Sequence, residues 1–149
     1  IDRKGRLNIF YNDLQLRLHH LRLDHPAVNL ADWIEIPVNF TGPVGYLHAS
    51  YDAVDDIIML AFAETGTWTT YFGVKHTDAN TWMMAPLPAN TPGTLLMYAR
   101  ALRANGRYYI LLSEHIVNGP NANYSAAVMF DSSNANGPWT RRDLHRPQG

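Results

Sequence analysis

An internal repeat of about 50 residues runs through this sequence and limits the folds that it can adopt. Segments 5–13, 56–64 and 106–114 each read as a turn, an apolar run, a small or polar residue and an acid. The runs are rich in Tyr, Phe and Ile, which favour strands, and they are too short to be typical helices. Repeats of this length are typical of propellers and solenoids, so we expect a repeated β-sheet unit.

A tryptophan marks the same place in each repeat. Trp33, Trp82 and Trp139 each follow a polar turn and precede a short predicted strand. The interval before Trp139 is the longest, and the Asn-, Gly- and Pro-containing segment 118–123 accounts for it as an inserted loop. We expect these three side chains to lie in the cores of the sheets.

Further strands complete each repeat. One lies between the two markers, at 15–23, 68–76 and 124–130, and a leading strand precedes the apolar run at 45–51 and 95–102. Four antiparallel strands per unit, repeated, make a propeller blade.

We therefore predict an all-β, β-propeller-like fold in a single domain, 1–149, of three blade-like repeats at about 1–40, 41–90 and 91–149. The first repeat lacks its leading strand. An ordinary antiparallel sandwich or barrel of about eleven strands is the alternative. Because propellers usually close with four to eight blades, we expect either a homo-oligomer or the remainder of a longer propeller to complete the ring.

Composition excludes several classes of protein. The 149 residues carry 12 Lys and Arg against 13 Asp and Glu and contain no Cys. We therefore expect no nucleic-acid partner, no thiolate metal site and no Cys nucleophile. No apolar run approaches the roughly 20 residues of a membrane helix, so we expect no membrane insertion.

We also expect no cofactor and no metal. The chain has no Gly-rich phosphate loop and no G-x-S-x-G motif. His19 and His20 point to opposite sides of a strand and so do not form a natural chelate. Two glycosylation sequons, at Asn39 and Asn123, favour an extracellular or secreted protein.

Three acids occupy the same place in the three repeats: Asp13, Glu64 and Glu114. A glycosidase needs two carboxylates that flank the sugar bond, one protonated and one ionised, so these are the candidate catalytic residues. The alternative is a structural role, in which each acid closes the second strand of a blade and binds turn amides.

The leading strands supply candidate ligand-binding residues, because in a propeller they line the central channel. A shift of 50 residues aligns His48 with Tyr98 and Ser50 with Arg100. His48 could shuttle a proton or hydrogen-bond a sugar, and Arg100 could bind the carboxylate of a sialic or uronic acid in bidentate fashion. The alternative is a channel-lining polar residue or an ion pair between blades.

Aromatic residues near turns are the other candidates for ligand binding. Apolar sugar faces stack on such rings, and Trp68, Tyr71 and Tyr124 are flanked by turns or by the insertion. Trp68 lies outside the repeated tryptophan pattern and is the best of these candidates.

The last repeat carries a family resemblance. Residues 106–113, 126–133 and Gly137-Pro138-Trp139-Thr140 resemble a blade of the five-bladed glycoside hydrolases. The turns before Trp82 and Trp139 also resemble the Asp-box of sialidase-type propellers. The resemblance implies a propeller and a carbohydrate partner, and it identifies no catalytic residue.

These observations favour a lectin-like module that binds a glycan or oligosaccharide at shallow, repeated sites. A glycoside hydrolase that uses paired carboxylates is the first alternative. A propeller scaffold that binds another protein is the second.

Overall fold

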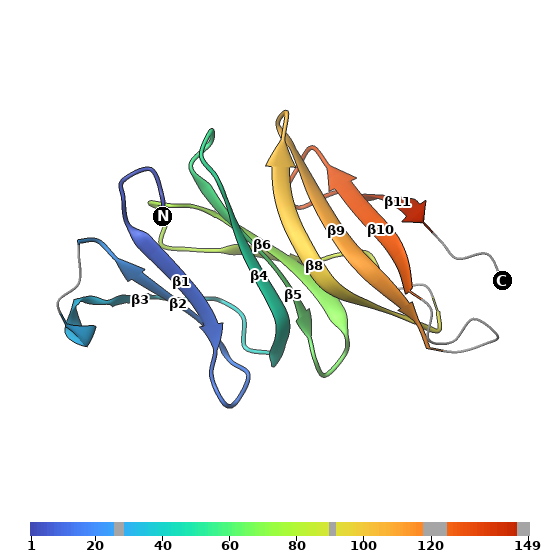
Figure 1. The fold of residues 1–149 in the computed structure, drawn as a ribbon, viewed down its shortest axis with the longest axis horizontal. Coiled ribbons are helices and arrows are strands. Elements are labelled where there is room, and N and C mark those ends of the chain that lie inside the picture. Colours follow the sequence, from blue (N-terminus) through green and yellow to red (C-terminus); the bar gives the residue numbers. More distant parts are fainter. Residues whose placement is uncertain (26–28, 90–91, 118–124, 146–149) are drawn as a thin grey trace.

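The computed structural model describes residues 1–25, 29–89, 92–117 and 125–145. It contains three antiparallel sheets that follow one another along the chain and lie side by side, as Figure 1 shows from blue to red. Each sheet is a meander in which neighbouring strands in sequence are neighbours in space. The predicted all-β, propeller-like fold is confirmed.

We call the three sheets blade 1, blade 2 and blade 3. Blade 1 has three strands, and blades 2 and 3 have four each. The strands of blade 1 are β1 (Leu7–Asn12), β2 (Leu18–Leu23) and β3 (Ile34–Ile36), with a short 3-10 helix (Leu30–Asp32) before the last. Those of blade 2 are β4 (Val44–Asp52), β5 (Ile57–Glu64), β6 (Thr69–His76) and β7 (Met83–Pro86). Those of blade 3 are β8 (Thr94–Ala104), β9 (Arg107–Ile116), β10 (Ser125–Ser132) and β11 (Thr140–His145).

The hairpins that open blades 2 and 3 differ in length. Residues 53–56 join β4 to β5, whereas Asn105 and Gly106 alone join β8 to β9. Both of these residues have positive φ, 50° and 72°, as a two-residue type I′ hairpin turn requires.

This difference corrects the alignment of the leading strands. Because one hairpin is two residues shorter, the strand pairing makes His48 equivalent to Arg100, not to Tyr98. Tyr98 corresponds instead to Tyr46. A single shift of 50 residues holds for the second strands only.

The blades pack face to face through two apolar cores. Side chains of β5, β6, β8, β9 and β10 form the core between blades 2 and 3, where Phe72, Leu96, Ile110 and Val128 are fully buried. Phe62, Leu60, Val44 and Trp82 form the core between blades 1 and 2. Because β5 contributes to both cores, almost all of its residues are buried, and it appears in the sequence as a continuous apolar run.

No helix in the described part of the chain is long and apolar enough to cross a membrane.

Candidate functional site

The innermost strands of blades 2 and 3 carry a β-bulge at the same place. Pairing with the second strand shifts between Gly45 and His48 in β4, and between Met97 and Arg100 in β8. Inside these bulges Tyr46 and Tyr98 have φ angles of 54° and 56°. The left-handed region costs a non-glycine residue about 1–2 kcal/mol, and bulges of this kind commonly re-aim a side chain beside a functional site.

The two bulges bring aromatic side chains into one row. The ring centroids of Tyr46 and Tyr98 are 4.7 Å apart in an edge-to-face contact across the boundary between blades 2 and 3. The ring centroid of Tyr46 lies 6.1 Å from that of Trp68, and the ring centroid of Tyr98 lies 6.0 Å from that of His115. We call Trp68, Tyr46, Tyr98 and His115 the aromatic row. The tyrosines remain 39% and 49% exposed, so neither belongs to an apolar core.

The turn between β5 and β6 holds Trp68 at one end of this row. Its amide donates to the carbonyl of Glu64 at 2.7 Å, and its φ of 57° lies in the left-handed region. The backbone therefore fixes the direction in which the Cα–Cβ bond of Trp68 leaves the turn.

A surface hollow of about 400 Å³ adjoins the other end of the row. Its lining includes Tyr98 and Arg100 from β8, Ser113 from β9 and Ser125 from β10. His115 contributes a ring nitrogen 3.2 Å from the Ser125 hydroxyl. Hydroxyl, imidazole and guanidinium groups thus border the exposed tyrosine.

Arg100 differs from the other arginines of blade 3. It donates to the carbonyl of Ala99 at 3.3 Å, and within the described ranges no carboxylate lies within ion-pair distance of it. The other arginines of this blade are paired with acids: Arg103 with Asp52, Arg107 and Arg142 with Asp131, and Arg141 with Glu114. The guanidinium of Arg100 is therefore available for an external anion.

His48 occupies in blade 2 the position that Arg100 occupies in blade 3. Burial, together with the nearby Arg100 guanidinium, lowers the pKa of His48. The side chain is half-buried, and its Nδ1 atom has no hydrogen-bond partner in the described structure. His48 is therefore neutral at neutral pH and can donate or accept a single hydrogen bond there.

The three predicted catalytic acids lie at the same end of the second strands but have different surroundings. Asp13 follows β1 and accepts hydrogen bonds from the Gln15 and Arg17 amides, the Arg17 side chain and His19. Burial alone would raise the pKa of Asp13, but the hydrogen bonds from Arg17 and His19 lower it further than burial raises it. Asp13 is therefore ionised at neutral pH.

Glu64 and Glu114 contrast with each other. The half-buried Glu64 ends β5 and accepts a hydrogen bond from the Thr67 hydroxyl in the turn that carries Trp68. Glu114 is fully buried; its two oxygens accept from Arg141 at 3.0 and 2.8 Å, and Thr94 donates to one of them at 3.0 Å. Of these two acids, Glu64 is the one that is not fully buried, and its carbonyl accepts from the Trp68 amide at one end of the aromatic row.

The remaining predicted ligand residue in the described structure is Tyr71. It packs with Phe40 and Phe62 at centroid distances of 4.8 and 5.7 Å, beside the core between blades 1 and 2. Tyr124 lies outside the described residues. Two residues of the row, Tyr46 and His115, were not among the predicted ligand-binding residues. A search for a Tyr-x-(His/Arg)-Ala pattern would have found Tyr46, because that pattern recurs at Tyr98.

One side-chain group in the described residues has metal-ligand spacing: Asp56, His76 and Asp78, whose ligand atoms lie within 4.8 Å of one another. Lys4 and Arg6 pair with the Asp78 oxygens at 2.7 and 2.8 Å. Tyr51 and Thr77 donate to Asp56 at 2.6 and 2.7 Å. Protein donors already satisfy these carboxylates, so we assign no metal to the group.

Comparison with known proteins shows the fold class. No protein-family model matches the chain, and no curated protein sequence is significantly similar to it. Among solved structures, an ulvan lyase of polysaccharide lyase family PL25 superposes with a TM-score of 0.63 at 15% identity, covering 98% of this chain and 41% of the lyase. The same lyase is also known bound to -[GlcA(1-4)Rha3S]-.

Two further structures have the same fold. GH43B of the Bacteroides ovatus xyloglucan PUL matches with a TM-score of 0.60 at 13% identity, covering 95% of this chain and 27% of that one. An endo-arabinase of Bacteroides thetaiotaomicron VPI-5482 matches with a TM-score of 0.53 at 12% identity, covering 96% and 58%. The chain thus has a propeller-like fold found in carbohydrate-active proteins, and it spans less than two thirds of the length of each.

Proposed function

We propose that the chain binds carbohydrate through the aromatic row. The observation that carries the proposal is the contact of exposed aromatic side chains from two blades, held by strained backbone at two equivalent bulges. Flat rings with polar edges suit the alternating apolar faces and hydroxyls of a sugar. Conformational strain of this kind is often retained at functional sites.

We further propose that the bound sugar is acidic. The guanidinium of Arg100 lies beside Tyr98 and is not engaged by a carboxylate in the described structure. A guanidinium binds a planar carboxylate in bidentate fashion, and uronic and sialic acids carry such a carboxylate. The oligosaccharide bound by the PL25 lyase contains glucuronic acid, which supports this proposal.

A glycan array that contains acidic and neutral oligosaccharides tests both proposals. We expect selective binding of acidic glycans by the wild-type chain and loss of binding in Trp68→Ala and Tyr98→Ala. Arg100→Gln should remove the preference for acidic glycans. The glycans that this variant still binds should be bound more weakly than by the wild-type chain. Val54→Ala is the matched control, since Val54 is 80% exposed in the loop between β4 and β5. A wild-type array without binding would refute the proposal.

Glycan cleavage is a second candidate function. It is favoured by Glu64, the half-buried carboxylate in the turn region that carries Trp68. Hydrolysis requires a second carboxylate, and of the predicted partners, Asp13 and Glu114, only Asp13 is not fully buried. Glu64→Gln should abolish the release of new sugar ends while glycan binding persists. Turnover that is unaltered in this variant would exclude the role of Glu64.

We also propose that further blades complete the ring, supplied by a longer polypeptide or by copies of this chain. The three solved neighbours are all longer than this chain, which supports this proposal. An extracellular location fits a glycan-binding protein, and the exposed Asn39 of the first sequon is accessible for glycosylation.

A further inference from the structure

The aromatic row has charges of opposite sign at its two ends. Glu64 is the only charged residue in segment 64–69, which forms the turn that presents Trp68. At the other end of the row, the guanidinium of Arg100 lies beside Tyr98 and is not paired with a carboxylate among the described residues. The two ends therefore favour different sugar units.

Of the three equivalent acids, Glu64 alone lacks a cation to balance its charge in the described part of the chain. Asp13 and Glu114 each pair with an arginine, whereas no described Lys, Arg or His lies within ion-pair distance of Glu64. The Thr67 hydroxyl donates to the Oε2 atom of Glu64 at 2.5 Å, a length typical of a hydrogen bond to a carboxylate. The negative charge is therefore held against the residue that precedes Trp68.

Backbone contacts fix the position of this charge. A Cβ atom at residue 42 would lie 2.6 Å from the Glu64 Oε1 atom, so Gly42 leaves the space that the carboxylate occupies. The Trp68 amide donates to the Glu64 carbonyl at 2.7 Å and ties the turn to the same residue. Exposed charges interact over roughly 8 Å in physiological salt, so the Glu64 charge acts on a sugar bound at Trp68.

The two ends of the row are too far apart for a single sugar. Tyr46 lies between Trp68 and Tyr98, with ring centroids 6.1 Å from Trp68 and 4.7 Å from Tyr98. A pyranose ring is similar in size to one phenol ring and covers one such side chain. A ligand that reaches from Trp68 to Arg100 must therefore be an oligosaccharide, and its units meet different charges.

Each end discriminates between acidic and neutral sugars by its charge. An acidic unit at Trp68 would bring a second carboxylate toward Glu64, and the two like charges would repel. A neutral unit brings hydroxyl groups instead, and a hydroxyl donates a strong hydrogen bond to a carboxylate. At the Arg100 end the preference is reversed. Repulsion of one ligand class contributes to specificity as attraction of another does.

We propose that the aromatic row selects an oligosaccharide in which a neutral stretch adjoins an acidic one, with the neutral unit at Trp68 and the acidic unit at Tyr98. This assignment rests on the proposed function, because it places the units of the glycan on the same row. A chain that is acidic throughout meets repulsion at Glu64, and a chain that is neutral throughout offers Arg100 no carboxylate.

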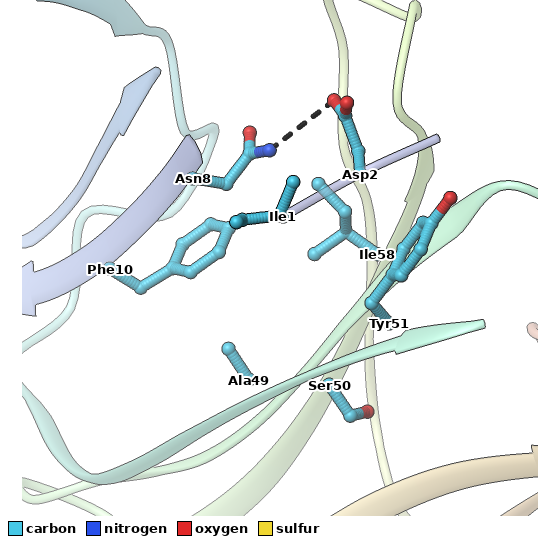
Figure 2. A pocket seen from close by; sticks show the side chains of 8 residues that line it. All are labelled: Ile1, Asp2, Asn8, Phe10, Ala49, Ser50, Tyr51 and Ile58. Atoms are coloured by element: carbon cyan, nitrogen blue, oxygen red, sulfur yellow. Dashed lines mark hydrogen bonds between the residues drawn. The ribbon is translucent and has the colours of Figure 1, made fainter. Parts of the chain in front are cut away.

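A second hollow, of about 170 Å³, lies between blades 1 and 2 (Figure 2). Phe10 of β1 and Ala49 of β4 are among the residues that line it. Its carboxylate, Asp2, accepts hydrogen bonds from the side chains of Arg6 and Asn8, so its charge is already balanced. An oligosaccharide that is selected by opposite charges at its two ends should not bind in this hollow.

Four β-1,4-linked tetrasaccharides with the same backbone test the proposal. One is glucose throughout, one is glucuronic acid throughout, and two carry glucuronic acid only in the reducing or only in the non-reducing half. Calorimetric titration of the full 149-residue chain should show one half-acidic chain bound at least about tenfold more tightly than the other three. Binding of the fully acidic chain as tightly as either half-acidic chain would overturn the proposal and leave glycan binding intact. No binding of any of the four would refute carbohydrate binding itself.

Variants assign the preference to one end of the row. Glu64→Gln keeps an oxygen acceptor for the Thr67 hydroxyl but removes the charge, so it should bind the fully acidic chain about tenfold more tightly than the wild type does. Its unchanged binding of the preferred half-acidic chain would show that it is folded. Asp55→Asn is the matched control, because it removes the same charge from the exposed loop at the opposite end of β5, and it should bind all four chains as the wild type does. A Glu64→Gln variant that still rejects the fully acidic chain as strongly as the wild type would contradict the proposal.

Discussion

Protonation of His20 should destabilise the protein on mild acidification. His20 is fully buried between blades 1 and 2, where its ring stacks on Phe10 at 4.4 Å and its Nε2 atom hydrogen-bonds Asn8 at 2.8 Å. Burial, reinforced by the Lys75 and Arg22 charges, lowers the pKa of His20 to about 3. In the unfolded chain the pKa of a histidine is about 6.5.

The size of the effect follows from this difference in pKa. Below pH 6.5 the unfolded state binds a proton that the folded state does not, so the free energy of unfolding falls as pH decreases. The loss is about 1.4 kcal/mol per pH unit, or about 2 kcal/mol between pH 6.5 and pH 5. The acids with lowered pKa, among them Asp78 at about 2, lose their stabilising contribution only below about pH 4, outside this window.

Urea unfolding at pH 7, 6 and 5 measures this dependence. His20→Gln should be less stable at pH 7 because of altered packing, but its stability should fall less between pH 6.5 and 5 than that of the wild type. His48→Gln is the matched control, because the pKa of His48 is also lowered; it should retain most of the wild-type slope. A His20→Gln variant with the full wild-type slope would show that His20 does not cause this pH dependence.

Three further predictions concern packing, ion pairing and backbone strain. Arg141→Met should lower the free energy of unfolding by about 3–5 kcal/mol, more than Glu114→Gln, since it leaves the fully buried Glu114 carboxylate without its guanidinium; equal losses in urea titrations would contradict this. Phe72→Ala should cost about 3–5 kcal/mol by thermal and urea unfolding, because this fully buried ring contacts Tyr108 and Trp139; a loss below about 1 kcal/mol would show that the core between blades 2 and 3 is not close-packed. Tyr98→Gly should be about 1 kcal/mol more stable than Tyr98→Ala by urea unfolding, since glycine adopts a φ of 56° without strain, while both lose glycan binding; the reverse order of stability would argue against a strained bulge.

The sequence was most informative where a strand is buried on both faces. Strand β5 belongs to two cores, so its residues form a continuous apolar run. This run, and the repeat that was aligned on it, could be recognised from the sequence alone. Three tryptophans were expected in the cores. Trp82 is 3% exposed in the core between blades 1 and 2, whereas Trp33 and Trp139 are only partly buried, with Trp139 packed against the core between blades 2 and 3.

The candidate site was less predictable, because it depends on small backbone irregularities. The bulges at Tyr46 and Tyr98, together with one hairpin that is two residues shorter, change which residues of the leading strands correspond. A fixed repeat length therefore paired His48 with the wrong partner and missed Tyr46. The Glu114–Arg141 ion pair joins residues 27 positions apart in the sequence, and no local sequence pattern predicts it.

A glycan bound at the aromatic row should change the chemical environment of that row. Amide and side-chain chemical-shift mapping of the full chain, titrated with a uronic-acid oligosaccharide and separately with a neutral one, measures this change. We predict that the acidic ligand shifts resonances of Tyr46, Trp68, Tyr98 and Arg100 first. Shifts that gather instead around Asn8, Phe10 and Ala49, or are absent at saturating concentrations of both sugars, would contradict it.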